Sequence, residues 1–93
     1  MNISIEESGN KGAAVAREDN TQIGMMTYSI AGTGLIIVDH TEVSESHKNS
    51  GVGLAMLHEV VAMAREKKIK IMPLCPFASA MFKKHEDIRD VLK

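Results

Sequence analysis

The first half of the chain alternates apolar and polar residues in four short runs. Residues such as Gly9 and Asn10, which favour turns, separate these runs. A period of two residues is typical of β-strands, and short turns join strands that lie antiparallel. The pattern predicts a four-stranded antiparallel meander, with strands over Asn2–Glu7, Gly12–Glu18, Ile23–Ala31 and Leu35–Val43.

From Gly51 to Lys68 the apolar residues recur at helical spacing, which predicts an amphipathic helix with its buried stripe at Leu54, Leu57, Val61 and Ala64. The run Ile69–Leu74 predicts a fifth strand. Because the helix is long enough to cross the sheet, this strand should lie parallel to the fourth. Pro73 cannot donate a backbone hydrogen bond, so we expect the pairing to end early and to leave a gap between these two strands.

Pro76 is well suited to the first position of a second helix, with Cys75 at or next to its N-cap. Residues 85–93 then form a final turn or short helix. The element order β-β-β-β-α-β-α predicts an α+β fold, and the length of 93 residues leaves room for one domain over residues 1–93.

Composition narrows the possible functions. The net charge is −1 and no basic run is interleaved with aromatic residues, so nucleic acid is not an expected partner. One cysteine cannot form an internal disulfide and, with four scattered histidines, gives no metal-ligand spacing; it fits a reducing cytoplasm. The polar first residues predict no signal peptide, and no apolar stretch approaches the roughly 20 residues of a membrane span. We expect a cytoplasmic monomer that binds no metal, nucleic acid or membrane.

The stretch from Val38 to Gly53 predicts a strand, a loop and a helix N-terminus in succession. Unpaired backbone N–H groups and the positive end of the helix dipole meet at such a junction, and Gly51 and Gly53 add no Cβ. An anion, most plausibly a phosphate, should bind there, with Asn49 or Ser50 as the N-cap. The alternative is that the glycines only permit a tight turn or close packing of the helix on the sheet.

The segment Val43–Gly53, V-S-E-S-H-K-N-S-G-V-G, resembles the acetyl-CoA loop of GNAT-type N-acetyltransferases, V-x-P-x-x-R/Q-G-x-G-x-G/A. Lys48 stands where Arg or Gln is usual, Glu45 replaces the proline and Asn49 replaces a glycine. The resemblance implies that main-chain amides bind the pyrophosphate, which tolerates the change at Lys48. Asn49 is acceptable even where φ must be positive, since Asn is the residue that best tolerates it after glycine.

Two further motifs narrow the resemblance. Asp39–Val43, with H-T-x-V, and Leu74–Ala78, with L-C-x-F, are similar to a short, single-domain GNAT-like family. The resemblance implies acetyl-CoA as co-substrate, an amine as acceptor, and a minimal GNAT-like core. It implies a cofactor-binding surface made of Val43, Lys48, Asn49, Ser50, Gly51, Val52, Gly53, Leu54, Cys75, Phe77, Ala78, Met81 and Lys84.

Three residues are candidates for catalysis. Regular alternation along the fourth strand places His40 and Glu42 on one face together with Ile36 and Val38. Cys75 ends the neighbouring strand at a helix N-terminus, which favours a thiolate, so His40 and Cys75 could converge. The alternatives are that the cysteine is a small buried apolar residue and that the histidine serves structure.

Two mechanisms follow from these candidates. In direct transfer, His40 or Glu42 removes the amine proton and Cys75 protonates or orients the leaving thiolate. In the covalent version, Cys75 is acetylated first, with His40 as its base.

The function is expected to be transfer of an acetyl group from acetyl-CoA to an amine, with a protein or peptide lysine as one acceptor class. A module that binds CoA or acyl-CoA without turnover is the main alternative, and a structural or interaction domain is a third.

Overall fold

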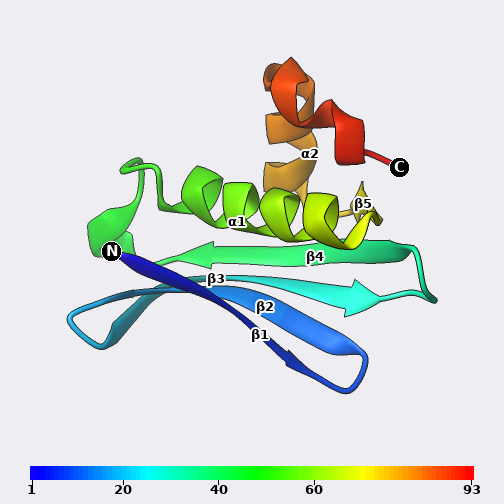
Figure 1. The fold of residues 1–93 in the computed structure, drawn as a ribbon. Helices are drawn as coiled ribbons and strands as arrows, with labels where there is room; N and C mark the ends of the chain where they lie inside the picture. The colour runs from blue at the N-terminus through cyan, green and yellow to red at the C-terminus, as the bar shows by residue number, and fades with distance from the viewer.

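A five-stranded sheet organises the fold in the computed structural model, which describes residues 1–93 (Figure 1). The strands follow one another across the sheet in chain order, so that each pairs with the next. The first four are antiparallel and the fifth is parallel to the fourth, which confirms the predicted α+β arrangement. Their bounds are β1 Asn2–Ser8, β2 Lys11–Glu18, β3 Thr21–Ile30, β4 Leu35–Val43 and β5 Lys70–Pro73.

The helices pack on one face of this sheet. They are η1 Glu45–His47, α1 Val52–Lys67, α2 Pro76–Lys84 and η2 Glu86–Val91. Figure 1 shows α1 lying along the sheet, with α2 standing at a steep angle beside it. None of these helices is long and apolar enough to cross a membrane.

One hydrophobic core fills the space between the helices and this face of the sheet. Its fully buried members come from both layers and include Ala14, Met26, Tyr28, Ile36, Val38, Met56, Leu57, Val60, Val61, Ala64, Ile71, Ala78 and Phe82. Leu57, Val61 and Ala64 lie in the stripe that the helical spacing predicted, whereas Leu54 is only half-buried. The opposite face of the sheet has no helix over it.

A β-bulge at Asp39 divides β4 into two halves. Thr27 of β3 pairs with His40, whereas Tyr28 pairs with Val38, so Asp39 is an extra residue in β4. Such an insertion reverses the side-chain alternation after it. Upstream of Asp39, Val38 points into the core. Downstream, Thr41 and Val43 point to the helix side instead of His40 and Glu42.

The prediction that His40 and Glu42 share a face with Ile36 and Val38 is therefore wrong. His40 and Glu42 do lie on one face together, but it is the uncovered face of the sheet. A regular period of two cannot anticipate an inserted residue, because the apolar pattern of β4 reads equally well without one.

A gap opens between β4 and β5, as Pro73 predicted. The parallel ladder ends at the pair of Val38 with Pro73. The backbone N–H groups of Leu74 and Cys75 then both donate to the Val38 carbonyl, at 3.0 and 3.1 Å, and the chain turns into α2. Beyond Val38, β4 has no strand neighbour on this side, so alternate backbone N–H and C=O groups of residues 39–43 face the gap.

Candidate active site

The N-terminus of α1 presents a row of unpaired donors. The backbone N–H groups from Asn49 to Leu54 have no acceptor within the protein, and no side chain caps the helix. The N-cap is Gly51, so the prediction of Asn49 or Ser50 at this position is wrong. The Ser50 hydroxyl donates to the carbonyl of His47 and accepts no hydrogen bond from the first turn of α1. Since the first turn contains no acidic side chain, the positive end of the helix dipole is also uncompensated.

The loop before α1 folds into this shape because two residues adopt positive φ angles. Asn49 has φ of +63° and Gly51 has φ of +87°. Asn tolerates this region better than any other residue except glycine, which explains how it can stand in place of the family glycine. A Cβ on Gly51 would meet no atom within 4 Å, so the space beside this residue is open to a ligand.

A pocket of about 340 Å³ lies against these donors, within the usual range for small-molecule sites. It runs from the loop along the end of β4 to the first turns of α2. Its lining combines the loop with apolar side chains of both helices: Thr41, Val43, His47, Lys48, Asn49, Gly51, Val52, Gly53, Leu54, Phe77 and Met81. Most residues that the family resemblance assigned to the cofactor therefore surround one cavity.

Four of the assigned residues do not line this pocket, and one of them, Cys75, is buried behind it. Ala78 is fully buried in the core, and Lys84 is exposed at the end of α2. Ser50 lies in the loop, with its hydroxyl bonded to His47. Among these four, only Ser50 belongs to the row of unpaired backbone N–H groups beside the expected anion.

Gly53 allows close packing of two helices. The Gly-x-Gly spacing in the sequence fits this role and anion binding equally well. A Cβ on Gly53 would lie 2.7 Å from Cζ of Phe77, inside any permissible contact. The missing side chain lets the Phe77 ring of α2 lie against the first turn of α1. Gly51 therefore keeps space open for a ligand, whereas Gly53 lets two helices approach each other.

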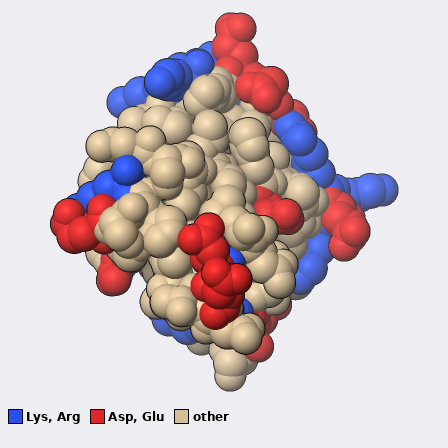
Figure 2. Space-filling model, turned by 90° about the vertical axis from the view of Figure 1, so that its left-hand side faces the viewer, with Lys and Arg blue, Asp and Glu red and all other residues tan.

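Cationic side chains contribute little to the charge of the pocket. Lys48 pairs with Glu45 at 3.0 Å, and His47 bonds through Nε2 to Glu18 at 3.0 Å. The His47 hydrogen bond lowers the pKa of Glu18 below its ordinary value. Figure 2 shows this end of the molecule, where Lys and Arg lie mainly at the rim and acidic groups lie both at the rim and near the middle. An anion bound here must be held mostly by backbone N–H groups.

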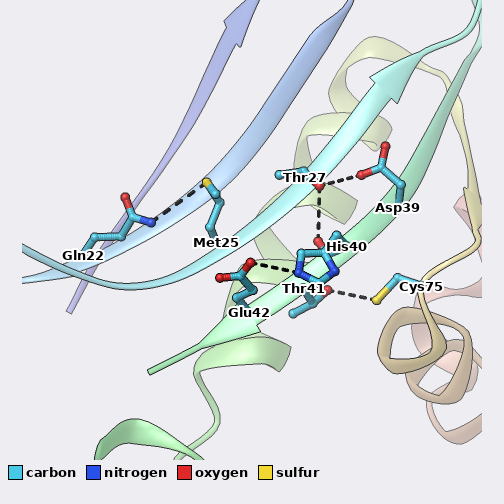
Figure 3. Close-up of polar contacts among 8 residues, drawn as sticks. All are labelled: Gln22, Met25, Thr27, Asp39, His40, Thr41, Glu42 and Cys75. Carbon is cyan, nitrogen blue, oxygen red and sulfur yellow. Dashed lines mark hydrogen bonds and ion pairs between the residues drawn. The ribbon is translucent and has the colours of Figure 1, made fainter. Parts of the chain in front are cut away.

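Cys75 is buried behind the pocket. It is the N-cap residue of α2, as predicted, but only 3% of it is exposed. Its Sγ lies 3.1 Å from Oγ1 of Thr41, and Thr41 in turn lines the pocket (Figure 3). The expected convergence of His40 on Cys75 does not occur, because the bulge at Asp39 turns Thr41 toward the thiol and His40 away from it.

His40 and Glu42 form a pair on the uncovered face of the sheet. His40 Nε2 lies 2.9 Å from Glu42 Oε1, and both side chains are more than half exposed (Figure 3). They belong to the part of β4 that borders the gap, so they and Thr41 lie on opposite faces of the same strand segment. An imidazole paired with a carboxylate can accept a proton from a group that approaches this face.

A hydrogen-bonded carboxylate holds the bulge itself. Asp39 accepts from Thr27 Oγ1 at 2.5 Å and from Ser29 Oγ at 3.0 Å. The Thr27 hydrogen bond is the main reason that the pKa of Asp39 lies below its ordinary value. These contacts hold the inserted residue toward β3 and so support the reversed alternation that follows it.

The sequence motifs did not assign two of the pocket residues, Thr41 and His47, to the cofactor site. Thr41 is part of the H-T-x-V motif, which was the available signal, but its contact with Cys75 depends on the bulge. His47 had no signal beyond its position in the loop.

A second depression, of about 460 Å³, lies between β1 and α1 and is a poor candidate for an anion. Its lining includes the carboxylates of Glu7, Glu59 and Glu66 against the single amine of Lys67. Excess negative charge would repel a phosphate there. The structure has no group of three or more His, Cys, Asp or Glu residues that could hold a metal ion.

Comparison with known proteins identifies a family and similar structures for this chain. The family model of the GCN5-related N-acetyltransferases matches residues 13–91. A GCN5-like protein of Staphylococcus aureus has a similar structure at 32% identity, with 97% of this chain and 87% of that chain covered and a TM-score of 0.69. No curated protein matches the chain.

Two less similar structures share the fold. Ribosomal-protein-alanine N-acetyltransferase of Brucella melitensis biovar Abortus 2308 is 23% identical, over 85% of this chain and 60% of that chain, at a TM-score of 0.66. A GNAT family acetyltransferase of Elizabethkingia anophelis with acetyl-CoA bound is 22% identical, over 67% of this chain and 41% of that chain, at a TM-score of 0.60. Because the family model matches residues 13–91 of the 93, the chain belongs to the GCN5-related N-acetyltransferases.

Proposed function

We propose that the protein binds acetyl-CoA in the pocket before α1 and transfers its acetyl group to an amine. The observation that supports this most is the row of unpaired N–H groups from Asn49 to Leu54 at an uncapped helix N-terminus. A pyrophosphate supplies the acceptor oxygens that such a row needs. The pantetheine arm then extends along the end of β4 toward Thr41, between apolar side chains such as Val43 and Phe77.

The acceptor is an amine presented by a protein or peptide, and it approaches from the uncovered face of the sheet. No helix of the chain walls off this face, which suits a large partner better than a small molecule that needs enclosure. The carboxylate of Glu42 attracts a protonated amine, and the His40–Glu42 pair accepts the proton that the amine must lose. Cys75 lies on the other side of the strand, so the amine attacks the thioester directly.

The proposal is tested by mixing the protein with acetyl-CoA and lysine-containing peptides, while thiol release and peptide mass are followed. We expect free CoA and an acetylated peptide, with no acetyl group on the protein itself. Glu42→Gln should slow turnover by at least about tenfold. The matched control is Glu66→Gln, which removes a carboxylate from the distant depression between β1 and α1 and should leave turnover unchanged.

Three results would count against the proposal. Tight binding of CoA without transfer to any amine would make the protein a binding module. An acetyl group retained on Cys75 would replace direct transfer by the covalent mechanism. Failure to bind CoA at all would remove the assignment of the pocket.

A further inference from the structure

Thr41 is a polar residue, whereas the residues beside it on the helix side of β4 are apolar. It projects from β4 to the helix side of the sheet, between the core residue Val38 and the half-buried Val43. A valine would suit a strand equally well, since both residues are β-branched. The hydroxyl therefore calls for a reason other than strand formation.

The hydroxyl of Thr41 connects the pocket to the buried thiol. Thr41 lines the pocket, whereas Cys75 does not and is only 3% exposed. The two side chains are 3.1 Å apart, within hydrogen-bonding distance, and either atom can be the donor. The backbone of Cys75 is held to the same strand, because its N–H donates to the Val38 carbonyl at 3.1 Å. Thr41 is therefore placed to pass a proton between Cys75 and a bound ligand.

We propose that Thr41 relays a proton from Cys75 to the departing sulfur of CoA, an inference that rests on the proposed acetyl transfer. The amine nitrogen forms the new C–N bond to the thioester carbonyl, and the C–S bond breaks with its electron pair on the CoA sulfur. Thr41 donates its hydroxyl proton to that sulfur while it takes the proton of the Cys75 thiol. The thiolate of Cys75 then recovers a proton from water, and the proton lost by the amine passes to water, so that no net proton is gained or lost by the protein.

The relay explains why a buried cysteine can take part in catalysis without being a nucleophile. Because Cys75 is only 3% exposed, its thiol cannot reach the acetyl carbonyl unless the structure opens, but it can act through a hydroxyl that already touches the pocket. Thr41 also acts without changing how CoA binds, because the pyrophosphate is held by the loop before α1. The role therefore predicts a loss of turnover with little change in affinity.

The test compares Thr41→Val, which keeps the shape and removes the hydroxyl, with Thr41→Ser, which keeps the hydroxyl. We expect Thr41→Val to lower kcat by about 10- to 100-fold, while the Kd for CoA changes by less than about twofold. Thr41→Ser should retain kcat within about threefold. Thermal unfolding of each variant, with and without CoA, checks that the fold and the pocket persist.

A double-mutant cycle with Cys75→Ala separates a relay from a packing contact. If Thr41 and Cys75 act in one relay, Thr41→Val should cause almost no further loss of kcat in the Cys75→Ala protein. Independent losses that multiply would overturn the relay, as would a Thr41→Val protein with unchanged kcat or a Thr41→Ser protein as slow as Thr41→Val. A wild-type protein that binds CoA but transfers no acetyl group would overturn the proposed function and the relay with it. If the wild type is active but the variants give one of the three results named before, the relay is overturned and the proposed function stands.

Discussion

The contact between Gly53 and Phe77 gives a prediction whose size can be worked from distances. In Gly53→Ala the new Cβ would lie 2.7 Å from Cζ, 3.0 Å from Cε2 and 3.2 Å from Cε1 of Phe77. Carbon atoms attract best at about 3.5–4.0 Å, so the ring must retreat by about 0.8 Å or more. Because Phe77 also lines the pocket, this shift should change the site as well as the helix packing.

Two opposing terms set the effect of Gly53→Ala on stability. Overpacking costs about 1–3 kcal/mol. Alanine in place of glycine in a helix returns up to about 1 kcal/mol. The net loss in free energy of unfolding should be about 0–3 kcal/mol. The displaced ring should weaken CoA binding by about tenfold, equivalent to about 1.4 kcal/mol.

Denaturant unfolding measures the free energy of unfolding, and calorimetric titration measures the affinity for CoA, on the same variants. Gly34→Ala is the matched control, because a Cβ there meets nothing within 4 Å. Phe77→Leu in the Gly53→Ala background should recover stability, with a coupling of about 0.5–3 kcal/mol. The steric reasoning is refuted if Gly53→Ala is as stable as the wild type and binds CoA equally well, or if the two substitutions are additive.

Three further predictions concern residues outside the loop. Tyr28→Phe removes the hydrogen bond of the buried Tyr28 hydroxyl to Glu7 at 2.5 Å and should lower the free energy of unfolding by about 1–2 kcal/mol. Turnover should stay within a few-fold of the wild type. A loss of turnover of several hundred-fold would show that Tyr28 is a catalytic acid. Asp39→Asn should destabilise by about 1 kcal/mol at pH 7, since the carboxylate is exposed. The folded pKa of Asp39 is lowered, so its contribution to stability is present above the unfolded pKa of about 4 and is lost as the pH falls through the folded value. The urea midpoints of the wild type and Asp39→Asn should therefore converge in acid. A difference that stays constant with pH would contradict this. Cys75, at 3% exposure, should react with iodoacetamide more slowly than a free thiol, and rapid alkylation of the folded protein would mean that the thiol is open to the pocket.

Local rules account for the parts of the fold that the sequence predicted. The strand order follows from alternation and short turns, and proline chemistry accounts for two details. Pro76 occupies the first turn of α2 with Cys75 as N-cap. Pro73 ends the pairing of β5 with β4. These features depend on one or two residues each, so a sequence is enough to predict them.

The details of the site depend on geometry that no local rule specifies. One inserted residue, Asp39, decides whether His40 or Thr41 faces Cys75, and the apolar pattern of β4 is compatible with either. The two glycines of the Gly-x-Gly stretch are alike in sequence. Their different roles appear only when the Phe77 ring is seen against Gly53 and open space beside Gly51.

The location of the cofactor is tested most directly by the backbone amide resonances of the protein labelled with ¹⁵N, followed during titration with CoA. The row of unpaired N–H groups predicts that the largest shifts fall on Asn49–Leu54, with smaller changes at Phe77 and Met81. Saturation at about 100 times the Kd should also raise the free energy of unfolding by about 2.7 kcal/mol. Shifts confined to the depression lined by Glu59 and Glu66, with the loop unchanged, would contradict the assignment of this pocket to acetyl-CoA.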